Sequence, residues 1–179
     1  MKEPFHSINN PFESRRKTIS SIAIAMAGNT KVTLKSSDGR IYTVDEAVAS
    51  LSKVLMMSMN NEVRLNKNTR KSESESERII TLQNVSGKIL GLVIDYCTYH
   101  VQVAPRASAE TARIWDVEFM KPLVNGDKYA LVQLAQAARY LDIYSLLDLT
   151  CEYIADMIKG QTPEKLREIL NIQNDLPPE

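Results

Sequence analysis

Two helical patterns follow one another almost without interruption between Asp127 and Gly160. In the first, apolar residues at helical spacing form one stripe: Leu131, Leu134, Ala135, Ala138 and Leu141. The second has two apolar sides, one with Leu147, Cys151, Ile154 and Ile158 and the other with Leu146, Leu149, Tyr153 and Met157. A small domain core cannot easily bury both sides. The sequence therefore predicts a helical hairpin whose surplus apolar side is covered by the following chain or binds a partner.

The composition excludes several classes of function. At 179 residues with 44% hydrophobic residues, the chain is long enough for one globular domain with appended segments. Its 22 basic and 22 acidic residues cancel, so no basic field favours nucleic acid or an anionic membrane surface. No apolar run approaches the roughly 20 residues of a membrane-spanning helix. Cys97 and Cys151 lie in apolar helical patterns, which predicts buried thiols in a reducing, intracellular compartment.

Residues 1–29 are predicted to be a flexible extension that precedes the fold. Arg15, Arg16 and Lys17 come before the run Thr18–Ala27, which imitates a short secretory signal. The acidic Glu3 and Glu13 do not suit such a signal, and Met26 is a more natural start. We therefore expect the fold to begin near Lys31.

The first half of the folded chain reads as a hairpin and short helices. Lys31–Val44 alternates apolar and polar residues around Asp38-Gly39, which predicts a β-hairpin. Asp45 is the expected cap of a short helix. A second helix, from Ser52, carries more apolar residues than its own burial needs, so part of its surface is expected to be a contact surface; these residues are Val54, Leu55, Met56, Met57 and Met59.

In two segments the apolar residues do not recur at the spacing of a helix or a strand. Asn60–Arg78 and Val101–Ile114 are predicted to be a mobile loop and a mobile linker. Between them we expect a short strand with Ile80 and Leu82 and a buried helix opened by Ser86.

The remaining local signals concern the second half of the chain. Trp115 is interpreted as an anchor that fixes a crossing segment to the core. Gly160 is expected to end one helix, and Thr162-Pro163 to start the last one.

The sequence contains no constellation that predicts catalysis. There is no glycine-rich phosphate loop and no Gly-x-Ser-x-Gly motif. Cys97 and His100 alone are too few ligands for a zinc site. We therefore expect no catalytic, cofactor-binding or metal-binding residue, no cofactor and no small-molecule substrate. The remaining class of function is that of a module that binds other proteins.

Several stretches resemble a known family. They are KVTLKSSDGRIYTVDEAV, ITLQNV, DYCTYH, WDVEFMK, AARYLDIYSLLDLTCEYIADMIKGQTPEKLREI and NIQNDLPPE. Together they are similar to the S-phase-kinase-associated adaptor of SCF-type cullin ubiquitin ligases, in a divergent, plant-like form. The resemblance covers nearly everything from Lys31 onward.

The resemblance implies an α+β fold of the BTB/POZ type, a small sheet flanked by helices, in residues 30–143. Residues 144–179 would form a C-terminal helical extension, truncated relative to the family. It implies an adaptor in the nucleus and cytoplasm that bridges a cullin scaffold to F-box substrate receptors in ubiquitin-dependent degradation. The alternative is a self-associating BTB-type structural or regulatory protein.

The resemblance also implies two binding surfaces. F-box proteins would bind Cys151, Ile154, Ile158, Leu166, Leu170 and Ile172. The cullin would bind Leu55, Met59, Arg139 and Tyr140. The chain departs from the family at Ser58, Arg139, Lys165 and Leu170, and Pro122–Asn125 looks inserted. We expect Arg139, where the family usually has Asn, to weaken the cullin side.

Overall fold

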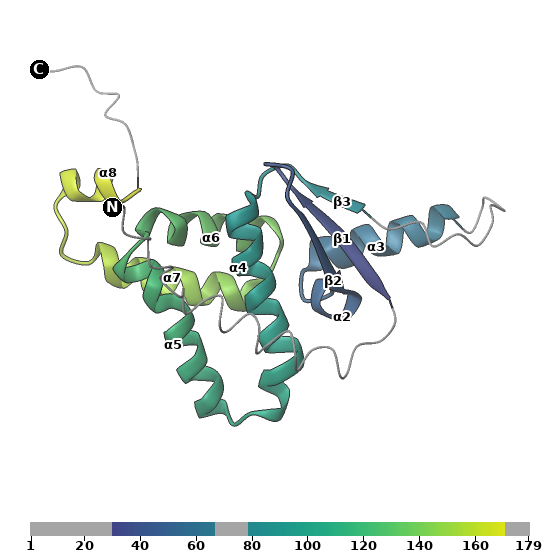
Figure 1. Cartoon of the computed structure of the whole chain (residues 1–179). Coiled ribbons are helices and arrows are strands. Elements are labelled where there is room, and N and C mark those ends of the chain that lie inside the picture. Colours follow the sequence, from purple (N-terminus) through teal and green to yellow (C-terminus); the bar gives the residue numbers. More distant parts are fainter. Residues whose placement is uncertain (1–29, 67–78, 171–179) are drawn as a thin grey trace, which may run out of the picture.

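The computed structural model describes residues 30–66 and 79–170. A three-stranded sheet in the order β2-β1-β3 forms one side of the molecule (Figure 1). β1 (Lys31–Ser36) pairs antiparallel with β2 (Ile41–Asp45) and parallel with β3 (Ile79–Leu82). The predicted hairpin and the predicted strand are confirmed.

Helices account for most of the rest of the described chain. α4 lies between the sheet and the later helices, and α6 packs against α4, α5, α7 and α8 (Figure 1). One hydrophobic core runs from the inner face of the sheet through α4 to α6 and the start of α7. The helices are α2 (Glu46–Ala49), α3 (Lys53–Asn66), α4 (Gly87–Thr98), α5 (Ala109–Asn125), α6 (Lys128–Tyr140), α7 (Tyr144–Ile158) and α8 (Pro163–Leu170).

The two segments predicted to lack regular structure are partly helical. α3 continues through Asn66, because Glu62, Arg64 and Leu65 are good helix formers and an existing helix extends into them at little cost. Residues 67–78 of the predicted loop lie outside the described residues.

The predicted linker Val101–Ile114 is also corrected. A π-helical turn, Tyr99–Val103, and a 3₁₀ turn, Ala104–Arg106, lead into α5, which starts at Ala109. The backbone N–H of Thr111 donates to the Ser108 hydroxyl at 3.1 Å and caps the new helix. The sequence prediction failed here because residues on the two sides of the segment contact one another and hold its ends together.

Aromatic rings supply those contacts. The Trp115 ring stacks on Tyr99 with centroids 4.0 Å apart and on Phe119 at 5.0 Å. Nearby, the Nε2 atom of His100 lies 2.8 Å from the Asp116 carboxylate. α5 is thereby fastened to the end of α4, so the interpretation of Trp115 as an anchor is confirmed.

The hairpin turn also caps α4. Gly39 adopts the left-handed φ of +81° that the turn requires. The Asp38 carboxylate accepts hydrogen bonds from the Ser36 hydroxyl at 2.5 Å and the Gly87 backbone N–H at 2.8 Å. Ser86, the residue before α4, makes no side-chain cap. A carboxylate from the hairpin therefore occupies the helix N-terminus, where the dipole favours negative charge.

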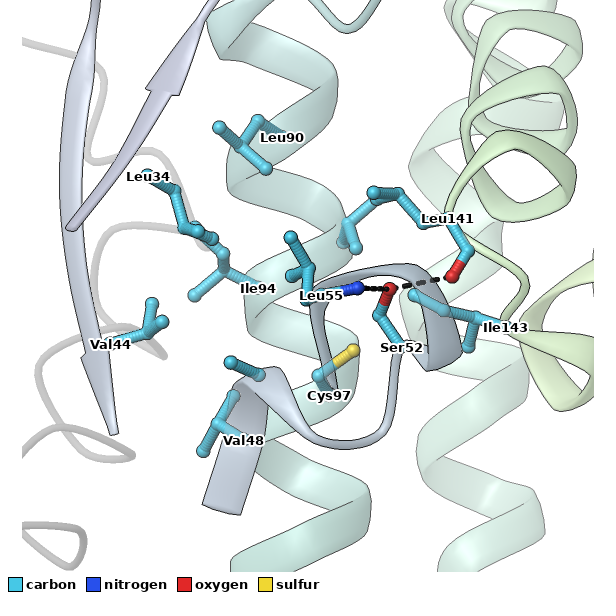
Figure 2. A pocket seen from close by; sticks show the side chains of 12 residues that line it. Leu34, Val44, Val48, Ser52, Leu55, Leu90, Ile94, Cys97, Leu141 and Ile143 are labelled. Carbon is cyan, nitrogen blue, oxygen red and sulfur yellow. Dashed lines mark hydrogen bonds between the residues drawn. The ribbon is translucent and has the colours of Figure 1, made fainter. Parts of the chain in front are cut away.

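Ser52 joins the first helices to the α6–α7 turn (Figure 2). Its buried hydroxyl donates to the Leu141 carbonyl at 2.5 Å and accepts from the Leu55 N–H at 3.2 Å. The apolar side chains around it enclose a cavity of about 10 Å³, lined among others by Val48, Cys97 and Ile143. Such a space is at the lower limit for one water molecule.

We expect Ser52→Ala to lower the free energy of unfolding by about 1–3 kcal/mol, because it leaves a buried carbonyl and a buried N–H without a partner. Urea denaturation measures the loss. Ser50→Ala is the matched control, since the Ser50 hydroxyl is exposed and bonds only within its own turn. Equal losses for the two variants would contradict the assigned role of Ser52.

Asp127 fixes the start of α6 to the start of α4. Its carboxylate accepts from the Ala130 N–H at 2.9 Å and pairs with the Lys88 ammonium at 2.5 Å. The hydrogen bond from Lys88, followed by the one from Ala130, lowers the pKa of Asp127 below its usual 3.8.

The lowered pKa of Asp127 predicts an acid-dependent part of the stability. This contribution is present above pH 3.8 and is lost as the pH falls through the lower folded-state pKa. Asp127→Asn keeps a capping side chain but removes the charge. We expect the free energy of unfolding of this variant to fall less steeply with decreasing pH than that of the unmodified chain. Urea denaturation, repeated from neutral pH down to the folded-state pKa of Asp127, measures the difference. Parallel pH curves would contradict the prediction.

Candidate protein-binding surfaces

A tight turn orients α7 against α6. Asp142 adopts a left-handed φ of +55°, a conformation that Asp tolerates better than most residues. The Ile143 N–H then reaches the Ala138 carbonyl at 2.9 Å. Leu141, Ile143 and Leu146 are almost fully buried. The predicted helical hairpin is confirmed, and the turn determines which side of α7 faces the core.

The apolar side of α7 with Leu147, Cys151, Ile154 and Ile158 is only partly covered by the core. Ile154 packs partly against the core, Ile158 is half-buried, and Cys151 is exposed. The prediction that both thiols are buried is therefore wrong for Cys151, because no described segment covers its side chain. It is confirmed for Cys97, whose burial raises the pKa of its thiol to about 12.

α8 follows α7 after a sharp turn. Gly160 has the left-handed φ of +73°, and the Lys165 N–H donates to the Thr162 hydroxyl at 3.4 Å, so the predicted stop and restart are confirmed. Ile169 is buried and α8 packs against α6 rather than along α7. Leu166 and Leu170 stay half-buried. We call Cys151, Ile154, Ile158, Leu166 and Leu170 the α7–α8 surface; Ile172 lies outside the described residues.

A second surface surrounds the α6–α7 turn. The Lys53 ammonium lies 3.8 Å from the Asp142 carboxylate and brings α3 beside this turn. A hydrogen bond with Asp142 raises the pKa of the Tyr144 hydroxyl. Large apolar side chains are exposed around this pair: Met56 (39%), Met57 (55%), Tyr140 (39%) and Tyr144 (64%). With the exposed Arg139, we call these four residues the α3–turn surface.

Two of the residues expected to bind the cullin lie beneath this surface. Leu55 and Met59 are only 4% and 3% exposed and belong to the core. Arg139 and Tyr140 are exposed as expected, whereas Tyr144 and the outward methionines were not among the expected residues. α3 is apolar on more than one side, so its sequence alone does not reveal which methionines face outward.

Within residues 30–66 and 79–170, no group of three or more His, Cys, Asp or Glu side chains could hold a metal ion. No described helix is long and apolar enough to cross a bilayer. What both surfaces offer is exposed apolar area, which is typical of protein contacts.

Comparison with known proteins identifies the family. SKP1-like protein 9 of Arabidopsis thaliana is 41% identical over 151 residues, which cover 83% of this chain and 88% of that protein. SKP1-like protein 1 of Oryza sativa subsp. japonica is 39% identical over 175 residues, with 87% and 92% covered. The chain belongs to the Skp1 family. Two models of that family match: the tetramerisation domain at residues 30–102 and the dimerisation domain at residues 144–179.

Membership in the Skp1 family confirms the α+β BTB/POZ fold with a C-terminal helical region. The plant relatives agree with the plant-like resemblance in the sequence. The α3–turn surface is not confined to one Skp1-family match, because Tyr144 falls in the second matched region and Arg139 and Tyr140 fall in neither. Met56 and Met57 fall in the first matched region, and the whole α7–α8 surface falls in the second.

Proposed function

We propose that this protein is a non-catalytic adaptor of an SCF-type ubiquitin ligase and that F-box substrate receptors bind its α7–α8 surface. The observation that carries the proposal is the apolar strip of α7, formed by Leu147, Ile154 and Ile158 beside the exposed Cys151, which the core covers only in part. Skp1-family membership and the SKP1-like relatives support the adaptor role. An apolar helix face of this kind suits a partner that packs helices against it.

We further propose that the cullin scaffold binds the α3–turn surface. Support comes from the four exposed apolar side chains around the Lys53–Asp142 pair. Methionine and tyrosine adapt to a partner surface and contribute large contact areas. The two surfaces use different residues, so both partners can be bound together. Localisation to the nucleus and cytoplasm stays a prediction.

Light scattering coupled to size-exclusion chromatography tests this function. The full chain is measured alone, with a recombinant F-box domain, with a cullin N-terminal region, and with both. The expected result is one copy of each in a ternary complex. Stable self-association without binding to either partner would overturn the adaptor function and favour a self-associating BTB-type protein.

We expect Arg139→Asn to strengthen cullin binding about tenfold or more, because a long cation facing an apolar or basic partner surface loses solvation without compensation. Calorimetry at matched salt measures the change. Lys128→Asn, an exposed cation at the other end of α6, is the matched control. Unchanged or weaker binding by Arg139→Asn would show that the guanidinium is accommodated or used.

A further inference from the structure

α7 carries a row of acidic side chains beside its apolar strip. Asp148, Glu152 and Asp156 are exposed and four residues apart, so they lie one above another on the helix. At the helical angle of about 100° per residue, Cys151 and Ala155 lie between this row and the apolar residues of the strip. The acidic row is therefore a border of the α7–α8 surface.

The isolated fold gains nothing from this row. Like charges four residues apart destabilise a helix. Asp156 is also in the last turn of α7, where the helix dipole disfavours negative charge and no basic residue is present. Within the described part of the chain, none of the three carboxylates forms an ion pair. Destabilising charge interactions that the fold does not require are typical of functional surfaces.

The surroundings neutralise the row only in part, since Lys159, three residues after Asp156, is the basic residue nearest to it in the sequence. Residues 144–170 contain five acidic and three basic side chains, although the whole chain is balanced. One of these bases, Lys165, is paired with Glu168 at 2.7 Å. Burial, and then the charges of Glu152, Asp116 and Asp156, raise the pKa of Tyr153. The border of the surface is thus negatively charged.

We propose that the partner of the α7–α8 surface carries a row of Lys or Arg beside its apolar contact residues and sets it against Asp148, Glu152 and Asp156. The inference rests on the proposed function, because it describes the F-box domain that docks on that surface. Charges at the rim of an apolar contact act chiefly on association rate and on the choice among similar partners. The acidic row accordingly selects F-box domains with a basic flank.

The test compares two doubly substituted chains with the unmodified one. Glu152→Gln/Asp156→Asn removes two charges of the row, and Glu46→Gln/Glu110→Gln removes two on α2 and α5. Binding of a recombinant F-box domain with a basic flank is measured by surface plasmon resonance at about 50 mM and about 300 mM salt. A second form of that domain has its basic flank replaced by Gln.

The row variant is expected to bind about three- to tenfold more weakly at low salt, mainly through slower association, and to lose most of its salt dependence. Its unfolding midpoint should be unchanged or higher, since repulsion within α7 is removed. The control variant should bind like the unmodified chain. The neutralised F-box domain should bind the unmodified chain more weakly as well.

Two results would overturn the inference alone: equal affinity of the row variant and the unmodified chain at low salt, or equal binding of both forms of the F-box domain. In both cases the apolar strip would still be the binding surface. Failure of the unmodified chain to bind any F-box domain is distinguishable from these, because it would overturn the proposed function and the inference with it.

Discussion

Ile158→Asp is expected to weaken binding of an F-box domain by about a hundredfold or more. Ile158 is half-buried at the end of α7 and is not part of the domain core. If a partner covers it, the new carboxylate is buried without a countercharge, which costs several kcal/mol. A loss of about 2.7 kcal/mol already corresponds to a hundredfold change in affinity. Calorimetry with a recombinant F-box domain measures the loss.

Stability measurements separate binding from folding in this experiment. Because Ile158 is half-buried and outside the core, we expect its substitution to lower the free energy of unfolding by only about 1 kcal/mol, which leaves the chain folded. Ile114→Asp makes the same chemical change at a residue of α5 that is 56% exposed and is not part of the α7–α8 surface. That control should bind normally. A folded Ile158→Asp variant with unchanged affinity would remove Ile158 from the interface.

Leu146→Ala should lower the free energy of unfolding by about 2–5 kcal/mol. The Leu146 side chain is fully buried at the point where α7 joins the core, so its truncation loses burial and leaves a cavity. Leu147, the next residue, is half-buried, and its replacement by Ala should cost about 1 kcal/mol. Urea denaturation with unchanged m-values measures both losses.

The pair Leu146 and Leu147 tests how α7 is oriented, because both residues belong to apolar sides of the same helix. A larger loss for Leu147→Ala would mean that the other side of α7 faces the core. The α7–α8 surface would then have to be redefined.

The sequence by itself determined the features that depend on neighbouring residues. Asp38-Gly39 required a turn, Gly160 ended a helix, and Thr162-Pro163 began the next one, since φ preferences and capping are local properties. Helical spacing likewise established the α6–α7 hairpin and the surplus apolar side of α7. The family resemblance followed from stretches that include these same elements.

Only the tertiary structure decided which apolar side of each helix is buried. Leu55 and Met59 face the core while Met56 and Met57 face outward, because Ser52 and Lys53 fix α3 against the α6–α7 turn. Cys151 is exposed because α8 packs on α6 instead of covering α7. Helical periodicity shows that a side is apolar, but what covers that side depends on residues distant in the sequence.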